Sequence, residues 1–333
     1  MELEYITEEE SPWRPELCRI WEQSVDLAAQ PDPFCCAPVW QLSAHRAFAP
    51  GRRVLAQHTE DSVLVLAEAF LSSGQPLLTS LEAHWLFGCP LLGPDAIGLL
   101  AEALAVMSHG YGHLPALLLG GIVPGSRRAR ELYACCESLF TIYLAGECIQ
   151  AGASLEGGLD GFLSRRSANL RSKWRKSFRR AADRGVTFER SCPTDTVGAD
   201  AVYARMLEQR SWKGVGHCGM TESPAREFYA DMIRRLAAQG TARVMFARHE
   251  GQDIGFIFGG MLGPCYRGQQ FSYDAAWKDL SIGNLLQVEQ IRWLCEEGAV
   301  RYDMGTASGE PMAYKLHWTE AHPTSQTWFL QPR

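Results

Sequence analysis

The sequence predicts an α/β protein with mixed sheets, built from two related domains in tandem. The main observation is an internal repeat at a spacing of about 190 residues. Residues 54–58 and 62–66 align without a gap onto residues 245–249 and 253–257. In each copy two apolar strands flank a short polar turn, which is the pattern of a β-hairpin.

A second observation is that both copies continue in the same way. Residues 96–100 (Ala-Ile-Gly-Leu-Leu) and 281–285 (Ser-Ile-Gly-Asn-Leu) each open an apolar-periodic helix, which ends at a glycine and leads into another strand. A length of 333 residues also favours about two domains. We therefore expect domains at 1–150 and 151–333.

The elements of the first half follow from apolar periodicity and from glycine and proline breaks. Helices are expected at 12–29, 39–47, 95–109 and 127–138, and strands at 53–58, 62–71, 115–122 and 141–145. In the second half we expect a long helix ending at 184, further helices at 195–212, 223–238 and 281–297, and strands at 186–191, 242–249, 253–262, 265–274, 299–304, 314–319 and 325–330. The last two strands would form a closing hairpin.

Composition is that of a core-forming globular protein, with 46% hydrophobic and 21% charged residues. No apolar run approaches the roughly 18 residues that span a bilayer, and the acidic N-terminus does not resemble a signal peptide. We therefore expect a cytoplasmic protein without a transmembrane segment. The eleven cysteines include no C-x-x-C pair, which favours free thiols over zinc or a redox dithiol. His109 and His113 lack the glutamate of a zinc motif, so no metal site is expected.

The strongest local feature is a basic segment at 165–184, with nine arginines and lysines against one acid, Asp183. This segment carries a charge of +8 in a chain of net charge −6. Leu170, Trp174 and Phe178 recur every fourth residue and should anchor the helix, with Arg171, Arg175 and Arg179 in the adjacent row. Such a concentration of charge predicts contact with a polyanion, such as coenzyme A phosphates, a tRNA acceptor arm or an anionic carrier. The alternative is a solvated helix whose arginines pair with acidic residues of the same chain.

Four segments of the second half resemble, in the same order, CelD-like GNAT acyltransferases, which are relatives of the FemABX aminoacyl-tRNA-dependent peptidyltransferases. These segments are the basic helix at 162–180, Arg-Ser-Trp-Lys-Gly at 210–214, the helix opening at 281–286, and Tyr-Asp-Met-Gly at 302–305 followed by Tyr-Lys at 314–315. The resemblance covers 155–333 well and the first half in outline. It implies two GNAT-like domains in a FemABX-like architecture, with the active centre in the second and an acceptor-side wall in the first.

The donor site is expected where the second-half helix opens. Free backbone N–H groups at a helix start bind anions. Ser281, Ile282, Gly283 and Asn284 would therefore hold the donor pyrophosphate, with Ser281 also capping the helix. The usual glycine-rich signature of the family is reduced here to Gly283, so the donor is either an acyl-CoA or an aminoacyl-tRNA.

The catalytic candidates follow from what amine acylation needs, which is a base for the amine and an acid for the leaving group. Asp303 and Lys315 come first, with a structural Asp303–Lys315 or Asp303–Arg pair as the rival interpretation. Tyr273 with Asp274 form a second acid–base pair. Tyr273, Tyr302 or Tyr314 could protonate a leaving thiolate, although each could equally belong to the core. The candidate substrate contacts are Trp212, Lys213, Tyr302 and His317.

The function expected is transfer of an acyl group from acyl-CoA to an amine by direct attack, without a metal. The resemblance suggests a small amino compound or a cell-envelope precursor as the acceptor. The alternatives are aminoacyl transfer from tRNA, and a non-catalytic relative that binds an anionic partner. The oligomeric state has no signal in the sequence.

Overall fold

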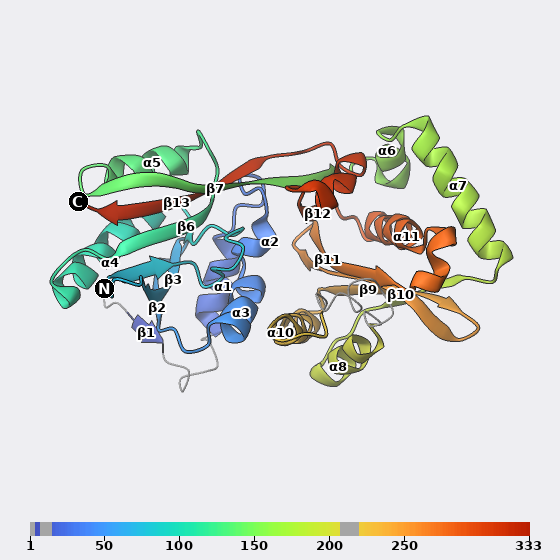
Figure 1. Ribbon diagram of the computed structural model, residues 1–333, viewed down its shortest axis with the longest axis horizontal. Coiled ribbons are helices and arrows are strands. Elements are labelled where there is room, and N and C mark those ends of the chain that lie inside the picture. Colours follow the sequence, from blue (N-terminus) through green and yellow to red (C-terminus); the bar gives the residue numbers. More distant parts are fainter. Residues whose placement is uncertain (1–3, 7–14, 207–219) are drawn as a thin grey trace. The chain divides into compact units, whose positions relative to one another are not determined.

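The computed structural model describes residues 4–6, 15–206 and 220–333, which fold into two compact units. Unit 1 comprises residues 1–149 and 323–333, and unit 2 comprises 150–322. Helices and strands alternate in both, so the α/β class is confirmed (Figure 1). The predicted domain limits differ from the units in the last eleven residues, because the C-terminal strand pairs with two strands of unit 1.

Unit 1 is a sheet in the order β1-β2-β3-β4-β6-β13-β7, with β5 paired to β3. Its strands are β1 (Glu4–Ile6), β2 (Val54–His58), β3 (Val63–Phe70), β4 (Pro76–Thr79), β5 (Leu91–Leu92), β6 (Ala116–Ile122), β13 (Thr324–Pro332) and the first part of β7 (Phe140–Ser154). Its helices are α1 (Pro15–Gln23), α2 (Pro33–Cys36), α3 (Pro38–Phe48), α4 (Ala96–Tyr111) and α5 (Arg127–Cys136). The predicted hairpin at 53–71 is confirmed as β2 and β3, which bury nearly continuous apolar runs.

Unit 2 is a sheet in the order β7-β12-β11-β10-β9-β8, whose two faces are covered by helices (Figure 1). The strands are the last part of β7, β8 (Thr187–Ser191), β9 (Ala242–His249), β10 (Gln252–Leu262), β11 (Cys265–Tyr273) and β12 (Arg301–Thr306). The helices are α6 (Gly158–Ser164), α7 (Ala168–Asp183), α8 (Thr196–Arg205), α10 (Ala225–Ala238), α11 (Ile282–Glu296) and two 3₁₀-helices, η3 (Ala275–Leu280) and η4 (Glu310–His317).

Two predicted elements of the second half are wrong. The basic segment is not one helix, because α6 ends at Ser164 and Ser167 caps a new helix by accepting a hydrogen bond from the amide of Leu170. Residues 314–319 are not a strand, since 310–317 form η4 and β13 has no hairpin partner before it. Tyr314, Lys315 and His317 therefore lie on a helical turn rather than on alternating faces of a strand.

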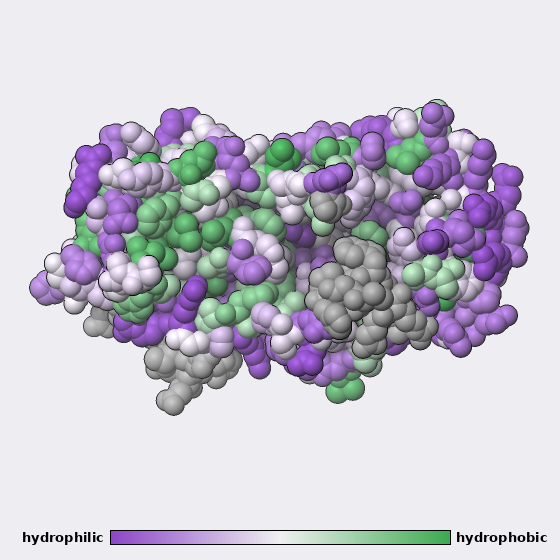
Figure 2. Space-filling view, in the orientation of Figure 1, coloured by the Kyte–Doolittle hydropathy of each residue, from purple (hydrophilic) through white to green (hydrophobic). Residues whose placement is uncertain are grey.

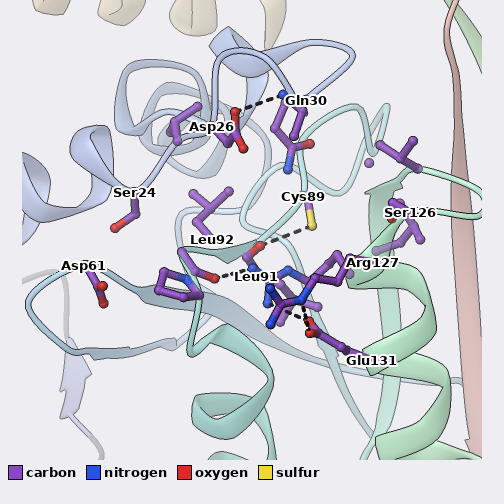
Figure 3. A pocket seen from close by; sticks show the side chains of 18 of the residues that line it. Ser24, Asp26, Gln30, Asp61, Cys89, Leu91, Leu92, Ser126, Arg127 and Glu131 are labelled. Carbon is purple, nitrogen blue, oxygen red and sulfur yellow. Dashed lines mark hydrogen bonds and ion pairs between the residues drawn. The ribbon is translucent and has the colours of Figure 1, made fainter.

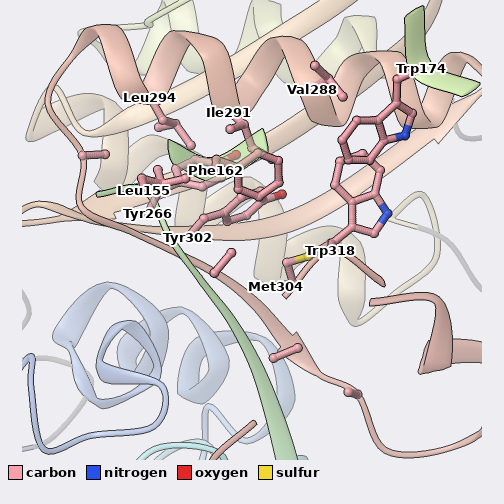
Figure 4. Close-up of a cluster of buried hydrophobic side chains, with 14 residues drawn as sticks. Leu155, Phe162, Trp174, Tyr266, Val288, Ile291, Leu294, Tyr302, Met304 and Trp318 are labelled. Carbon is pink, nitrogen blue, oxygen red and sulfur yellow. The ribbon is translucent and has the colours of Figure 1, made fainter. Parts of the chain in front are cut away.

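An aromatic core holds β11, β12 and α11 together in unit 2 (Figure 4). Trp174 of α7 stacks on Trp318 with 4.5 Å between ring centroids and lies nearly parallel to Phe162 of α6. Tyr266 and Tyr302 from the two neighbouring strands meet edge to face beneath the helix. Burial of such large rings is the main source of stability for this layer, and it fixes where β11 and β12 lie under α11.

Among the helices of the described residues, none has the length and apolar character needed to traverse a bilayer. Every cysteine in the same part of the chain is a free thiol, as the spacing predicted.

Candidate functional site

The central feature of unit 2 is a pair of parallel strands that separate. β11 and β12 pair only at Cys265–Arg301, Tyr266–Tyr302 and Arg267–Asp303. Beyond this point β11 continues for six residues and β12 for three, without further pairing between them. The ladder between β11 and β12 therefore ends where the two strands diverge. We call this place the strand parting.

A β-bulge stands at the start of the strand parting. The register between β10 and β11 moves from Gly259–Gly268 to Phe258–Gln270, so Gln269 has no residue opposite. Bulges re-aim side chains and leave backbone groups outside the ladder, and they are common beside active sites. The side-chain amide nitrogen of Gln269 is buried, and it donates no hydrogen bond within the described residues. This residue was not singled out from the sequence, because a bulge depends on pairing with a distant strand.

A buried arginine lies where the strands separate. Arg267 is 6% exposed, and its guanidinium donates to the carbonyl oxygen of Gly268 at 2.5 Å. The same guanidinium lies over Gly305 of β12, where an added Cβ would approach Nη2 to 2.5 Å. Gly305 also has a φ of 74°, so glycine is required there twice over. The glycine of the Tyr-Asp-Met-Gly motif thus makes room for Arg267.

Asp303 takes part in an ion pair rather than facing solvent. Its side chain is 4% exposed, and Oδ1 accepts a hydrogen bond from Nε of Arg301 at 2.6 Å. Oδ1 also lies 3.2 Å from where a Cβ on Gly152 of β7 would stand. The geometry therefore matches the rival interpretation, an Asp303–Arg pair, which here lies within β12, and it does not favour Asp303 as the base.

Lys315 is buried in the same way. Its side-chain nitrogen donates to the carbonyl oxygen of Thr306 at 2.7 Å, while its own carbonyl oxygen accepts from the hydroxyl of Thr319. These bonds tie η4 to the end of β12. His317, on the same 3₁₀-helix, is exposed. Of the three predicted residues of η4, only Tyr314 combines exposure with a position against β11.

The start of α11 directly follows the end of β11 through η3. Ser281 adopts a left-handed conformation, and its carbonyl accepts from the amides of Asn284 and Leu285, which leaves the amides of Ile282 and Gly283 ahead of the first intrahelical bond. The hydroxyl of Ser281 makes no capping bond, so that part of the prediction is wrong. Asn284 is partly exposed, while Ile282 is buried.

Gly283 is packed against aromatic rings. A Cβ added there would lie 3.0 Å from Phe271 and 3.1 Å from Tyr273. We expected Gly283 to allow close approach of a ligand, but its small size instead lets α11 begin against the side chains of β11. Ile282 and Gly283 are both buried, so Asn284 is the partly exposed residue of this first turn that an anion could contact.

The tyrosines predicted as acids have different surroundings. Tyr302 is buried, its hydroxyl accepts from the side chain of Gln287 at 2.6 Å, and desolvation raises its pKa well above the ordinary value. Tyr314 is 38% exposed, its ring meets Phe271 edge to face, and desolvation raises its pKa to about 12. Tyr273 lies beside Gly283. Phe271, which sequence analysis missed, thus links Tyr314 to the start of α11.

Asp274 ends β11 and caps η3. Its Oδ1 accepts from the amide of Ala276 at 2.9 Å, and the residue is partly exposed. The predicted pair of Tyr273 and Asp274 therefore lies at the end of β11, next to the start of α11 in the chain.

The basic face of α7 is largely unpaired. Arg165 and Arg166 pair with Glu320, and Arg180 and Arg184 pair with Asp279 of η3. The five basic residues between them are exposed, and the ion pairs of the described residues include none of them: Arg171, Lys173, Arg175, Lys176 and Arg179. We call these five residues the basic face, and Figure 2 shows hydrophilic residues gathered over this helix. The paired arginines at the ends of the segment agree with the second alternative in part, and contact of its middle with a polyanion stays a prediction.

Unit 1 has the corresponding parallel pair, but its parting is filled. β4 and β6 pair from Leu77–Ala116 to Thr79–Leu118, after which Gly120 and Gly121 contact the backbone of residues 86–89. The buried carboxylate of Glu82 organises this plug by accepting hydrogen bonds from the amides of His84, Trp85, Leu86 and Phe87. The first copy therefore has no open strand edge at this position.

Two predicted substrate contacts, Trp212 and Lys213, lie outside the described residues, as does the motif at 210–214. No group of three or more metal-binding side chains is found in the part of the chain that the structure describes.

The comparisons with known proteins agree with this geometry. Residues 164–316 match the family model described as acetyltransferase (GNAT) domain. This region is similar to a GNAT domain. It lies wholly within unit 2 and includes the strand parting, the start of α11 and most of η4. No curated protein matches the sequence.

Solved structures resemble the chain over its full length. FemX superposes with a TM-score of 0.66 at 13% identity, covering 100% of this chain and 98% of its own. L-PGS from Bacillus licheniformis gives 0.61 at 14% identity, covering 98% and 93%. A conserved protein of unknown function from Bacteroides thetaiotaomicron gives 0.61 at 13%, covering 99% of each chain. At these identities the likeness establishes the fold, which confirms the expected FemABX-like architecture with tandem GNAT-like domains.

Proposed function

We propose that the GNAT-like domain of this chain transfers an acyl group from an acyl-CoA to an amine, with the donor lying in the strand parting. The observation that carries the proposal is the separation of β11 from β12 directly before the start of α11. A donor whose acyl arm lies along β11 beyond Arg267 would place its phosphates at the start of α11, since helix starts attract anions.

The basic face supports the same placement. The C-terminal end of α7 contacts η3 through the Asp279 pairs, and η3 leads directly into α11. Arg179 and Arg175 lie one and two turns before that end. We propose that these two residues and Arg171 add positive charge on the outer side of the phosphate site.

The reaction proposed is direct attack. The neutral amine forms a bond to the acyl carbon, the carbon–sulfur bond breaks, and the thiolate takes a proton. Oxygen charge develops on the acyl carbonyl in between, and donors held in place by the protein stabilise it. We propose the bulge amides and the side-chain nitrogen of Gln269 for this role, since that nitrogen is buried without another acceptor in the described residues.

Tyr314 is the proposed acid, because it is exposed and keeps its proton at neutral pH. Asp274 is the proposed acceptor of the proton that the amine loses, since it is partly exposed at the end of β11. Asp303, Arg301 and Lys315 are proposed to hold β12 and η4 in place. Tyr302 is proposed to support the core and Tyr273 to flank the helix start.

An aminoacyl ester of tRNA is a second candidate donor, and one observation favours it. The basic face lies on a helix of 16 residues, about 24 Å long, which exceeds what one pyrophosphate needs. FemX and L-PGS share the fold, and the acceptor would then be an amino compound or a lipid- or envelope-linked precursor.

Calorimetric titration of the full chain with acetyl-CoA, longer acyl-CoAs and charged tRNA tests both donors. Saturable binding of an acyl-CoA, together with thiol release when an amine is supplied, supports the first proposal. For tRNA, a steep salt dependence that falls by about 2 to 3 units of slope when Arg171, Arg175 and Arg179 are changed to Gln supports the second. Absence of binding by every donor overturns both and favours a non-catalytic relative.

A further inference from the structure

Unit 1 contains a cavity of about 550 Å³ that shares no residue with the strand parting (Figure 3). Its walls come from the segment after α1, from β5, from the end of β6 and from the first turn of α5. Volumes of this size are typical of sites for small organic molecules. The plug that fills the parting of unit 1 ends at Cys89, which forms part of one wall, so the cavity exists in addition to the plug.

The polar group that points to a ligand is the guanidinium of Arg128. Nη2 donates to the carbonyl oxygen of Gly93, another wall residue. Nη1 is buried and makes no hydrogen bond within the described residues, and its ion pair with the carboxylate of Glu131 is long, at 3.8 Å. A buried charged donor without an acceptor is costly, and this cost is removed when a ligand supplies an anionic oxygen.

The acidic groups around the cavity already have donors. Oδ1 of Asp26 accepts from the amides of Ala28 and Ala29, and Oδ1 of Asp61 accepts from two neighbouring hydroxyls. Glu131 accepts from Nε of Arg127 at 2.6 Å. Figure 3 shows this last pair at the edge of the site, next to the start of α5. Oε1 of Gln30, another wall residue, is a buried acceptor without a hydrogen bond in the described residues, so the cavity offers one acceptor beside the donor of Arg128. Because the donor belongs to a guanidinium, it favours a ligand that carries an anionic oxygen.

The remaining walls are apolar and uncharged. Leu91, Leu92 and Ile122 are almost fully buried, and Val25 adds a further aliphatic surface. Desolvation raises the pKa of Cys89 to about 11, so its thiol is neutral and does not repel an anion. An aliphatic body would fit against these side chains while its charged end reaches Arg128.

We infer that this cavity binds a small organic anion, with a carboxylate or phosphate group on Nη1 of Arg128 and an aliphatic body against Leu91 and Leu92. The inference does not depend on the proposed acyl transfer, since it uses residues of unit 1 alone. Nothing in the fold comparisons assigns a ligand to this position.

Titration calorimetry of the full chain with hexanoate, and separately with inorganic phosphate, tests the inference. Saturable binding of hexanoate is expected, with affinity reduced at least tenfold in Arg128→Met, which keeps the aliphatic stem and removes the charge. Arg130→Gln is the matched control: it lies on the same helix, carries the same charge and forms no part of the cavity wall, so binding should stay within about twofold. Hexanol, which lacks the anionic group, should bind at least tenfold more weakly than hexanoate.

A second variant guards against a folding defect in Arg128→Met. Ala29 is exposed at the cavity mouth, so Ala29→Phe should leave the fold intact and obstruct the ligand, weakening hexanoate binding as well. Phosphate binding that is lost in Arg128→Met, without hexanoate binding, would assign a phosphate ligand instead of a carboxylate. Equal hexanoate affinity in wild type and Arg128→Met, or no binding of either probe, would overturn the inference.

Discussion

Asn284→Asp separates a phosphate site at the start of α11 from a merely structural helix end. The substitution adds one negative charge at almost constant size, at a partly exposed position in the first turn. The added carboxylate should stabilise the helix by about 0.3–1 kcal/mol through the helix dipole. A bound phosphate should feel the opposite effect. At a separation of about 5 Å the repulsion is about 1 kcal/mol in water and about 3 kcal/mol at an effective dielectric constant of 20.

The expected result is therefore a chain that is as stable as wild type, or slightly more stable, and that binds acetyl-CoA about tenfold more weakly. Urea denaturation measures the first quantity and calorimetric titration the second. Thr196→Asp provides the control, because it adds the same charge at an exposed position in the first turn of α8 and should leave acetyl-CoA binding unchanged. Unchanged affinity in Asn284→Asp would refute the placement of donor phosphates at this helix.

Three further predictions concern individual side chains. Asp303→Asn should lower the free energy of unfolding by about 1–3 kcal/mol in urea titrations, because it weakens the 2.6 Å hydrogen bond to Arg301. The kcat of the folded enzyme should fall less than tenfold. A hundredfold loss of kcat at unchanged stability would restore Asp303 as the base. Tyr314→Phe should lower kcat about a hundredfold with little change in KM, whereas Tyr302→Phe should affect only stability. Equal kinetics for both variants would rule out Tyr314 as the acid. Burial lowers the pKa of His45 to about 4, so on acidification the His45 side chain is protonated in the unfolded chain before it is protonated in the folded one. The free energy of unfolding should therefore decline by about 3 kcal/mol in total as pH falls from roughly 6.5 to 4. Urea titrations of His45→Gln should show less of this decline, and a pH profile identical to that of wild type would contradict the prediction.

The sequence was most informative where structure is local. The repeated hairpins, the helix that opens after residue 281 and the Leu170–Trp174–Phe178 anchor all depend on periodicity within a few turns, and each lies as predicted. The break at Ser167 was missed although Ser is a good N-cap residue, because the basic pattern continues across it.

Residues 310–317 show why the last hairpin was predicted wrongly. Apolar residues there allow a strand, but the segment is fixed by contacts that no local pattern reveals. Lys315 bonds to the end of β12 and Trp318 stacks on Trp174, more than 140 positions earlier in the chain. These tertiary contacts favour a 3₁₀ turn over the extended form.

The candidate site residues divide in the same way. Tyr314 and the first turn of α11 were identified from short motifs, while Arg267, Gln269 and Phe271 were not, because their roles follow from the parallel register and the bulge of β11. The Arg301–Asp303 pair had a signal in the sequence, since residues two apart on a strand share a face. That spacing could have favoured the structural interpretation of Asp303 from the outset.

Hydrogen–deuterium exchange with and without donor tests the central proposal, donor binding in the strand parting, most directly. With saturating acetyl-CoA, or with charged tRNA in a parallel series, slower exchange is expected in β11 after Arg267 and at the amides of Ile282 and Gly283. The peptides of β4 and β6, where unit 1 is plugged, should exchange at the same rate in both states. Donor-induced protection confined to unit 1, or absent from β11 and α11 with every donor, would contradict the account.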